Sequence, residues 1–290
     1  MNMSAATFLI PCILLGALFF WLPNSPHWLV KIGDYESAKR SISWYQPGND
    51  PDKELAIIKS MVGVSASEGF YQKMQKCRSE HVKRAIVLIV VLFTFMQLTG
   101  LNSVLFYMEI ILARSKLKYI KPSLVVICVN ASGMLASAIS VCLIDKYGRK
   151  FLLILSCVGV TMSMSGLAAN FHFVRMNLDI SSLQLLPIFS VFLFVIAYFI
   201  GLMSIPSTIL SEIFPSDIKC IAGCIASLVG AMWSFAATKS FQPLVDSIGE
   251  PSVFLLHGIF ALILIPYVCL FMPETKGQSL QEIQDKLMKT

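Results

Sequence analysis

The chain has 290 residues, of which 56% are hydrophobic and only 14% are charged. An average soluble domain contains about 25% charged residues, so this composition excludes an ordinary soluble fold. The formal net charge of +6 is expected in loops beside anionic lipid and not on a nucleic-acid surface, because no nucleic-acid-binding motif is present.

The first predicted element is a transmembrane helix over residues 5–22. This apolar stretch is about as long as one crossing of a ~30 Å hydrocarbon core requires. A cleaved signal peptide is the alternative, but it would carry basic residues before its apolar core. The first positive residue, Lys31, follows the stretch, which favours a retained helix.

Residues 31–84 form a polar segment in which two amphipathic helices are predicted on the cytoplasmic side of the membrane. Asp34 and Asp52 are expected to be their N-caps, because aspartate accepts hydrogen bonds from free amides at a helix start. The apolar positions with helical spacing are Ala38, Ile42 and Tyr45 in the first helix and Leu55, Ile58 and Val62 in the second. The alternative is a solvated linker.

Six further apolar stretches predict membrane spans at residues 85–113, 122–144, 151–174, 181–210, 221–237 and 251–272. The stretch at 181–210 differs because Gly201, Pro206 and Ser207 interrupt it. An interrupted helix at membrane depth is tolerated where its backbone faces protein or a wet cavity, and such helices often mark transporter binding sites.

The segment "DKYGRK", residues 145–150, places four charges between two spans. A charge at mid-bilayer costs about 2.5 to 3.5 kcal/mol, so this loop must lie at a membrane surface. If it is cytoplasmic, the inner segments hold 17 Lys and Arg residues and the outer segments hold 6. This excess predicts an amino end outside and a carboxyl end in the cytoplasm.

Several function classes find no support in the sequence. The eight cysteines have no metal-type spacing, so we expect no metal site. We also expect no cofactor and no enzyme, because Ser-His-Asp groupings and phosphate-binding loops are absent. A seven-helix receptor matches the predicted topology, but the chain has neither a D-R-Y nor an N-P-x-x-Y motif.

Four separated motifs resemble the sugar porter family of the major facilitator superfamily, most closely its facilitated trehalose transporters and glucose facilitators. They are "PNSPHWL" at 23–29, "DKYGRK" at 145–150, "SEIFPSDIKC" at 211–220 and "PETKGQSLQEI" at 273–283. The resemblance implies an all-α polytopic membrane protein that corresponds to half of a major facilitator fold, with family helices 6 to 12 present.

The same resemblance implies four segments. They are a single transmembrane helix at 1–30, an intracellular helical segment at 31–84, a six-helix bundle at 85–272 and a cytoplasmic tail at 273–290. It also implies a partner, either an amino-terminal half or a complete carrier, besides a small-molecule sugar and membrane lipid.

The segment "FMQLTGLNSVLFY", residues 95–107, resembles the sugar-binding Q-Q-L-S-G-I-N segment of the family. By this resemblance the candidate sugar ligands are Gln97, Thr99, Asn102 and Asn130. Amides suit sugars because they donate and accept hydrogen bonds together. Gln97 and Asn102 lie about 140° apart on a regular helix, so a shared cavity requires the bend that Gly100 permits. Hydrogen bonding between helices is the alternative role for such amides.

The resemblance also implies a cytoplasmic charge network that gates the carrier. Its members here are Asp145, Arg149, Lys150, Glu212, Lys219 and Glu274. The alternative is that these are ordinary loop charges. Asn24, His27 and Lys219 stand where the family has Glu, Arg and Arg, which should weaken the network because lysine lacks the arginine fork.

Substrate positions depart from the family as well. Met96, Phe199, Ser204, Ser207, Gly230 and Ala231 replace residues that are polar, aromatic or proline in related carriers. We therefore consider two functional hypotheses. The first is facilitative sugar transport, downhill and by alternating access, by a truncated carrier of the plasma membrane. The second is a non-transporting paralogue that binds sugar or associates with a complete carrier.

Overall fold

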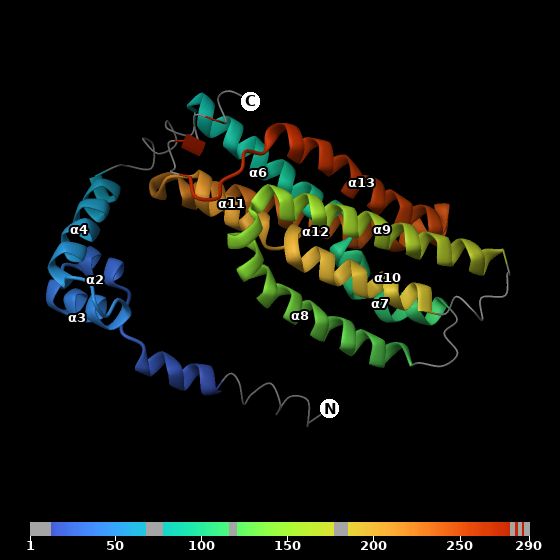
Figure 1. The fold of residues 1–290 in the computed structure, drawn as a ribbon, viewed down its shortest axis with the longest axis horizontal. Coiled ribbons are helices and arrows are strands. Elements are labelled where there is room, and N and C mark those ends of the chain that lie inside the picture. Colours follow the sequence, from blue (N-terminus) through green and yellow to red (C-terminus); the bar gives the residue numbers. More distant parts are fainter. Residues whose placement is uncertain are drawn as a thin grey trace. The chain divides into compact units, whose positions relative to one another are not determined.

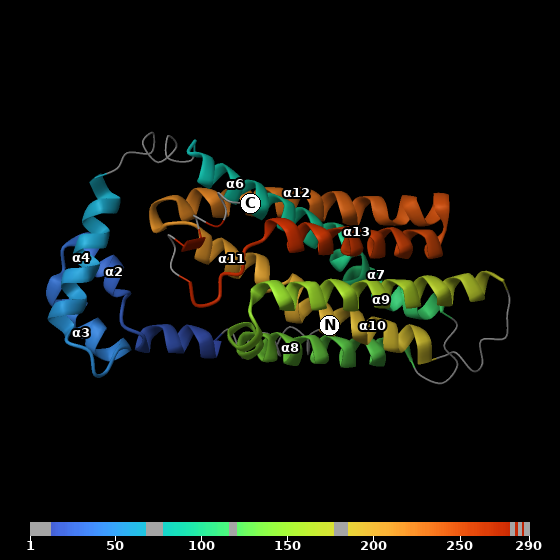
Figure 2. The ribbon, with the colours of Figure 1, turned by 45° about the horizontal axis from the view of Figure 1, so that its top comes forward.

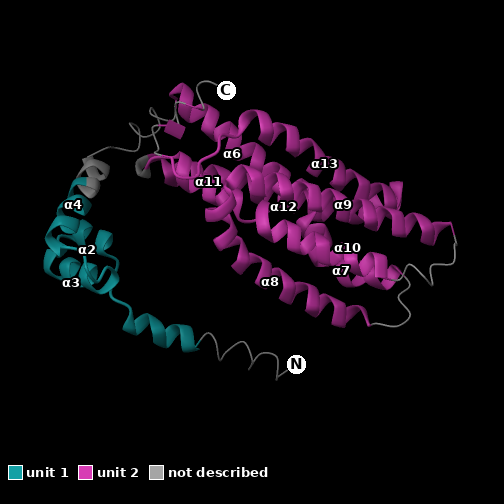
Figure 3. Ribbon diagram, viewed as in Figure 1, with its two compact units in different colours: residues 1–73 teal, residues 74–290 magenta. Residues whose placement is uncertain are grey.

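A computed structural model of the chain describes residues 13–67, 78–115, 121–176, 185–278, 282–283 and 286. These residues are mainly helical and contain no β-strand. The chain divides into two compact units, Met1–Lys73 and Met74–Thr290 (Figure 3). Four segments with boundaries at residues 30, 84 and 272 are predicted from the sequence. The division into two units does not test these boundaries, so they stay predictions.

Unit 1 holds helical residues 13–21, α2 (Pro26–Ile32), α3 (Tyr35–Tyr45) and α4 (Pro51–Ser67). The first two helices bend by 59° across the break that contains Pro23. Residues 5–12 of the first predicted span lie outside the described residues. The small core of this unit consists of Leu29, Val30, Ala38, Ile42, Leu55 and Ile58.

The structure confirms one of the two predicted caps in this unit. The Asp34 carboxylate accepts a hydrogen bond from the Ser37 amide at 3.1 Å, and the Ser37 side chain and this amide together lower the pKa of Asp34. The prediction for Asp52 is wrong, because α4 begins at Pro51 and the Asp50 carboxylate accepts from the Asp52 amide at 3.1 Å. Proline suits the first helical position, since its missing N–H would have no partner there.

The predicted apolar faces of these two helices are confirmed in part. Ala38 and Ile42 of α3 and Leu55 and Ile58 of α4 are buried. Tyr45 is exposed, so the buried face of α3 is narrower than predicted. The side chain of Val62 lies outside the described residues.

Unit 2 is a bundle of long helices (Figures 1 and 2). In chain order they are α6 (Glu80–Leu98), α7 (Leu101–Arg114), α8 (Pro122–Tyr147), α9 (Arg149–Arg175), α10 (Leu185–Ala197), a π-helix (Tyr198–Leu202), α11 (Ile205–Ile213), α12 (Ser216–Ile248) and α13 (Glu250–Phe271). Within the described residues, six helical stretches are long and apolar enough to cross a membrane. They match the six spans predicted after the polar segment.

Helix α9 lies at the centre of this bundle, and it packs against both α13 and α10. Leu153, Val160 and Met164 of α9 are completely buried in the main core cluster. Large apolar side chains are instead exposed on α8, including Met134 and Leu135. Apolar residues on the outside of such a bundle are expected to face lipid.

The span at 181–210 is interrupted, as predicted. Its helix changes at Tyr198–Leu202 into a π-helix, a form that often marks functional sites. Ser156 of α9 supports the change, because its hydroxyl donates to the Ala197 carbonyl at 2.7 Å and accepts from the Leu202 amide at 3.1 Å. Gly201 lies too close to α9 for a side chain, since a Cβ there would lie 2.7 Å from the Leu152 carbonyl oxygen.

Candidate functional site

The break between α6 and α7 positions the first group of candidate residues. Gly100 has φ 92°, a left-handed conformation that glycine adopts without steric cost, and α7 begins at the next residue. The side chains of Gln97 and Asn102 therefore do not point in different directions, as they would on one straight helix. The Asn102 amide nitrogen donates to the Gln97 side-chain oxygen at 2.9 Å. The predicted break at Gly100 is confirmed, and the two side chains meet across it; that they share a sugar-binding cavity stays a prediction.

Two buried side chains from other helices stabilise this break. The Tyr198 hydroxyl donates to the Met96 carbonyl at 2.8 Å, and His257 Nδ1 lies 2.7 Å from the Leu98 carbonyl oxygen. A carbonyl oxygen only accepts, so Nδ1 must donate in this contact. Both carbonyls belong to the last turn of α6, where no intrahelical donor is available. His257 thus gives the Leu98 carbonyl a hydrogen bond that the break would otherwise remove, and Tyr198 gives the Met96 carbonyl one in addition to that of the Thr99 hydroxyl.

Helix α12 completes a polar cluster beside the break. The Asn102 amide nitrogen also donates to the Ser234 hydroxyl at 2.6 Å. Gly230 keeps space open next to this cluster, because a Cβ there would lie 4.0 Å from Gln97 Nε2 and 3.4 Å from the Phe93 ring. We define Gln97, Asn102 and Ser234 as the amide cluster.

The amide cluster has unused hydrogen-bonding capacity. Within the described part of the chain, Gln97 Nε2 and Asn102 Oδ1 form no hydrogen bond. Gln97 Nε2 is a hydrogen-bond donor and Asn102 Oδ1 is an acceptor, and both side chains belong to helices that are packed in the bundle. This combination suits a ligand that is rich in hydroxyl groups, because each hydroxyl both donates and accepts.

The structure does not bring the other two candidate ligands into this cluster. Thr99 is buried, and its hydroxyl donates to the Met96 carbonyl at 3.0 Å, so it closes the end of α6. Asn130 is exposed on α8, where its amide donates one turn back to the Val126 carbonyl at 2.9 Å. Among the residues described, no hydrogen bond connects Asn130 with Gln97 or Asn102.

The charged candidates gather at one end of unit 2, which we name the Glu274 end. Arg149, at the start of α9, donates to Glu212 of α11 through Nη2 at 2.7 Å and Nε at 3.1 Å. Only 11% of the Arg149 side chain and 24% of the Glu212 side chain are exposed. Asp145 lies 3.4 Å from Arg149 and is largely exposed.

Glu274 occupies the amino end of α9. Its carboxylate accepts from the backbone amides of Arg149 at 2.9 Å and Lys150 at 3.1 Å. Those amides have no intrahelical partner, and the helix dipole favours a negative charge at this position. Gly148 makes the approach possible, because it has φ 89° and a Cβ there would lie 2.7 Å from the carboxylate.

Two predicted members of the charge network contribute differently from the others. Lys150 directs its ammonium to the Cys269 carbonyl at 2.8 Å instead of to a carboxylate. The side chain of Lys219 forms no ion pair within the described residues. The structure therefore brings together Asp145, Arg149, Glu212 and Glu274, and Lys150 joins them through backbone contacts.

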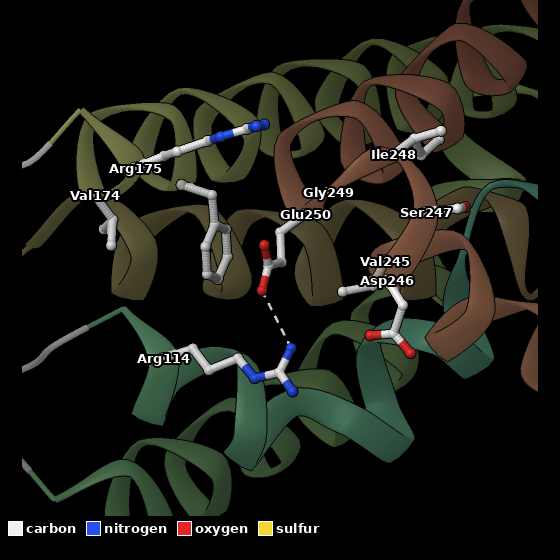
Figure 4. Close-up of a pocket in the computed structure, with 10 residues that line it drawn as sticks. Arg114, Val174, Arg175, Val245, Asp246, Ser247, Ile248, Gly249 and Glu250 are labelled. Carbon is white, nitrogen blue, oxygen red and sulfur yellow. Dashed lines mark hydrogen bonds and ion pairs between the residues drawn. The ribbon is translucent and has the colours of Figure 1, made fainter.

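The opposite end of unit 2, which we name the Glu250 end, holds a cavity of about 530 Å³. Arg114 at the end of α7 and Glu250 at the start of α13 point toward each other there, 3.1 Å apart (Figure 4). Arg175 and Asp246 also line the cavity. None of the candidate sugar ligands does, so the cavity is separate from the amide cluster.

Comparison with known proteins identifies the family. A family model described as "Sugar (and other) transporter" matches residues 2–287. The chain belongs to the sugar transporter family. Facilitated trehalose transporter Tret1 of Polypedilum vanderplanki is 30% identical over 281 residues, covering 96% of this chain and 55% of that protein. Tret1 of Drosophila pseudoobscura pseudoobscura is 29% identical over 274 residues, covering 93% of this chain and 31% of that protein.

Solved structures establish the major facilitator fold for this member of the sugar transporter family. The proton:xylose symporter XylE bound to 6-bromo-6-deoxy-D-glucose aligns with a TM-score of 0.74 and 24% identity, covering 97% of this chain and 58% of XylE. The inward open conformation of XylE from E. coli aligns with a TM-score of 0.69 and 23% identity. The chain thus spans about a third to just over half of the length of these proteins, and it is an integral membrane protein.

Three contacting residues were not predicted from the sequence: Tyr198, Ser234 and His257. His257 could have been found, because an ionisable residue inside an apolar span is a functional candidate by default. Tyr198 lies in the interrupted span but carried no separate signal. Ser234 could not be found from the sequence, since serine is common in such helices.

Proposed function

We propose that this chain forms the sugar-binding half of a membrane carrier, with the amide cluster as its principal site. The observation that carries this proposal is the hydrogen bond between Gln97 and Asn102 across the Gly100 break, which leaves a donor and an acceptor available. The family supplies the substrate class. The relatives named as trehalose transporters favour trehalose, and a hexose is the next candidate.

Transport in this proposal is facilitative and uses alternating access. A second bundle, from an amino-terminal half or a complete carrier, would close the sugar pathway over the amide cluster. Asn130, exposed on α8, would join the site only in a conformation where α8 lies closer to it. Thr99 would act through the shape of the break, because its hydroxyl is already engaged.

The Glu274 end is proposed as the cytoplasmic gate. Asp145, Arg149, Lys150, Glu212 and Glu274 would hold this end closed in one state, and Lys219 would contribute through a partner segment. Paired charges bias a two-state equilibrium only by their differential free energy between the states. We further propose a plasma-membrane location, with the amino end outside and the carboxyl end in the cytoplasm.

A non-transporting, sugar-binding paralogue is the second candidate, and specific positions favour it. Met96 and Phe199 are apolar where family members have polar residues, and Ala231 stands where they have an aromatic residue. Each lost hydrogen bond is worth about 1 kcal/mol. The affinity of this chain for sugar should therefore be lower than that of a carrier with the complete set of sugar-binding residues.

Uptake and binding measured on the same vesicles separate the two candidates. Vesicles that contain the full chain are incubated with labelled trehalose or labelled glucose. Saturable uptake supports the carrier, whereas saturable binding without uptake supports the non-transporting paralogue. In either case Ser234→Ala should weaken the sugar affinity several-fold.

Ser240→Ala is the matched control for Ser234→Ala. Ser240 lies on the same helix, but the one hydrogen bond that its hydroxyl forms within the described residues is to the carbonyl of Ala237, one turn back. The control should therefore leave sugar affinity unchanged. Absence of both uptake and binding, or equal effects of the two substitutions, would reject the amide cluster as the site.

A further inference from the structure

Unit 1 contains a cavity of about 570 Å³, lined by residues from its first helix, α2 and α3. This volume falls within the range of about 300 to 1,000 Å³ that is usual for small-molecule sites. Three of the four tryptophans of the chain, Trp21, Trp28 and Trp44, line the cavity. Each of them is more than half exposed. Exposed aromatic side chains that gather at one place indicate a binding surface.

Hydrogen bonds between the elements around this cavity fix its shape. The Ser41 hydroxyl of α3 donates to the Asn24 carbonyl at 2.5 Å, and the Tyr45 hydroxyl donates to the Pro23 carbonyl at 2.8 Å. These bonds attach α3 to the segment that precedes α2, and α2 packs against both α3 and α4. The cavity is therefore formed before a ligand enters, which is typical of small-molecule sites.

The polar part of the lining carries one positive and one negative charge, on Arg40 and Asp34. The Arg40 guanidinium is exposed and forms no hydrogen bond or ion pair with the residues that the structure describes. Ser37 lowers the pKa of Asp34 most, and the charge of Arg40 lowers it further. Asp34 is therefore an anion at neutral pH. The cavity thus offers a cation and an anion to one ligand.

The apolar part of the lining lies where the chain passes from an apolar to a polar segment. Phe20 and Leu22, at the end of the predicted span at 5–22, line the cavity together with Ile32 of α2. All three are exposed. In an integral membrane protein, apolar side chains at the end of a span lie against acyl chains, and tryptophan is enriched where hydrocarbon meets headgroups. A ligand at this level can therefore have an apolar part as well as charges.

We propose that this cavity binds a phospholipid with a choline headgroup. The phosphate lies at Arg40, whose planar guanidinium can donate two hydrogen bonds to it. The quaternary ammonium lies among the three tryptophans, beside Asp34, because aromatic faces attract such cations and tryptophan does so most strongly. An acyl chain follows Phe20 and Leu22.

Other ligand classes match the lining less completely. An anionic headgroup has no cation for the tryptophans, and it would bring a like charge close to Asp34. A neutral apolar molecule would leave both Arg40 and Asp34 without a partner. A zwitterionic headgroup with an acyl chain uses the cation, the anion, the aromatic faces and the apolar side chains together.

Tryptophan fluorescence of the full chain in a maltoside detergent tests the proposal. With Trp233→Phe, the three tryptophans of the cavity are the only reporters. Titration with phosphatidylcholine should give a saturable change. Phosphatidylethanolamine and phosphatidylglycerol should bind about tenfold more weakly, because the first lacks the methyl groups of choline and the second lacks a cation. Soluble phosphocholine should compete only at much higher concentration, since it has no acyl chain to bury.

Three variants in the Trp233→Phe background locate the site. Arg40→Gln should weaken phosphatidylcholine binding about tenfold, which is the effect of losing a hydrogen bond between charged groups. Asp34→Asn removes the negative charge but keeps an N-cap acceptor for α3, and it should reduce the preference for phosphatidylcholine over phosphatidylglycerol. Lys53→Gln removes a cation of the same unit outside the cavity, and it should have no effect.

Unchanged phosphatidylcholine binding in the Arg40→Gln variant, or an equal loss in Lys53→Gln, would overturn the proposal. Equal binding of the three lipids, or an unchanged preference in Asp34→Asn, would overturn the choline assignment. Equal potency of soluble phosphocholine would overturn the lipid assignment. No sugar is involved in these measurements, so their outcome is independent of the proposed transport function.

Discussion

The two ends of unit 2 both carry an arginine–glutamate pair, but the pairs are built differently. At the Glu274 end, Arg149 reaches Glu212 through two nitrogens, and its side chain is only 11% exposed. At the Glu250 end, Arg114 reaches Glu250 through one contact, with side chains 45% and 33% exposed. Exposed pairs contribute about 0 to 1 kcal/mol, whereas breaking a buried pair costs about 3 to 5 kcal/mol.

The difference extends to the surrounding backbone. The Glu274 carboxylate caps α9, and the Thr275 hydroxyl donates to Glu212, so helices α9 and α11 and the segment after α13 are connected. Only two side chains meet in the Arg114–Glu250 pair. The Glu274 end is therefore expected to act as one cooperative unit, whereas the Glu250 end can open at small cost.

The largest effect is expected for Arg149→Ala, which leaves the partly buried Glu212 without its cationic partner. We expect the free energy of unfolding to fall by about 3 kcal/mol. Arg149→Lys should recover less than half of this loss, because an ammonium cannot reproduce the two guanidinium contacts. Chemical unfolding in detergent measures both variants. Lys121→Ala, at an exposed position, is the control, and an equal effect there would contradict the comparison.

A smaller loss, about 2 kcal/mol, is expected for Gly148→Ala. The added Cβ would collide with the Glu274 carboxylate and would also force alanine into a left-handed backbone conformation. Gly277→Ala separates these two causes, because Gly277 has φ 66° but open space around its Cβ position. In thermal unfolding, the melting temperature of the Gly148→Ala variant should be lower than that of the Gly277→Ala variant. The reverse order would mean that the carboxylate is not held where the structure places it.

The smallest effect is expected for Arg114→Ala at the Glu250 end. The free energy of unfolding of this variant should fall by less than about 1 kcal/mol, and the loss should become smaller as added salt screens the exposed Arg114–Glu250 pair. Unfolding at low and high ionic strength measures this dependence. A salt-independent loss as large as that of Arg149→Ala would abolish the distinction between the two ends.

Much of the fold could be predicted from the sequence, because span length and loop charge are direct consequences of the bilayer. The Gly100 break was predictable as well, since two amides on opposite faces needed a bend to meet. Local chemistry also explains the error at Asp52, where the preceding proline shifts the helix start and makes Asp50 the cap.

The candidate site was predictable only in part. Gln97 and Asn102 meet as expected, but Asn130 lies apart on α8, because its place depends on how separate helices pack against one another. Ser234 and His257 enter through the same kind of contact, on α12 and α13. Sequence spacing within one helix carries no information about such contacts.

The central claim is that the amide cluster binds sugar, and tryptophan fluorescence tests it most directly. The chain has four tryptophans, and Trp233 is adjacent to Ser234. With Trp21, Trp28 and Trp44 replaced by phenylalanine, Trp233 becomes the single reporter. Titration with trehalose or glucose should give a saturable fluorescence change that Asn102→Ala abolishes. A change that is identical in Asn102→Ala, or no change with either sugar, would contradict the claim.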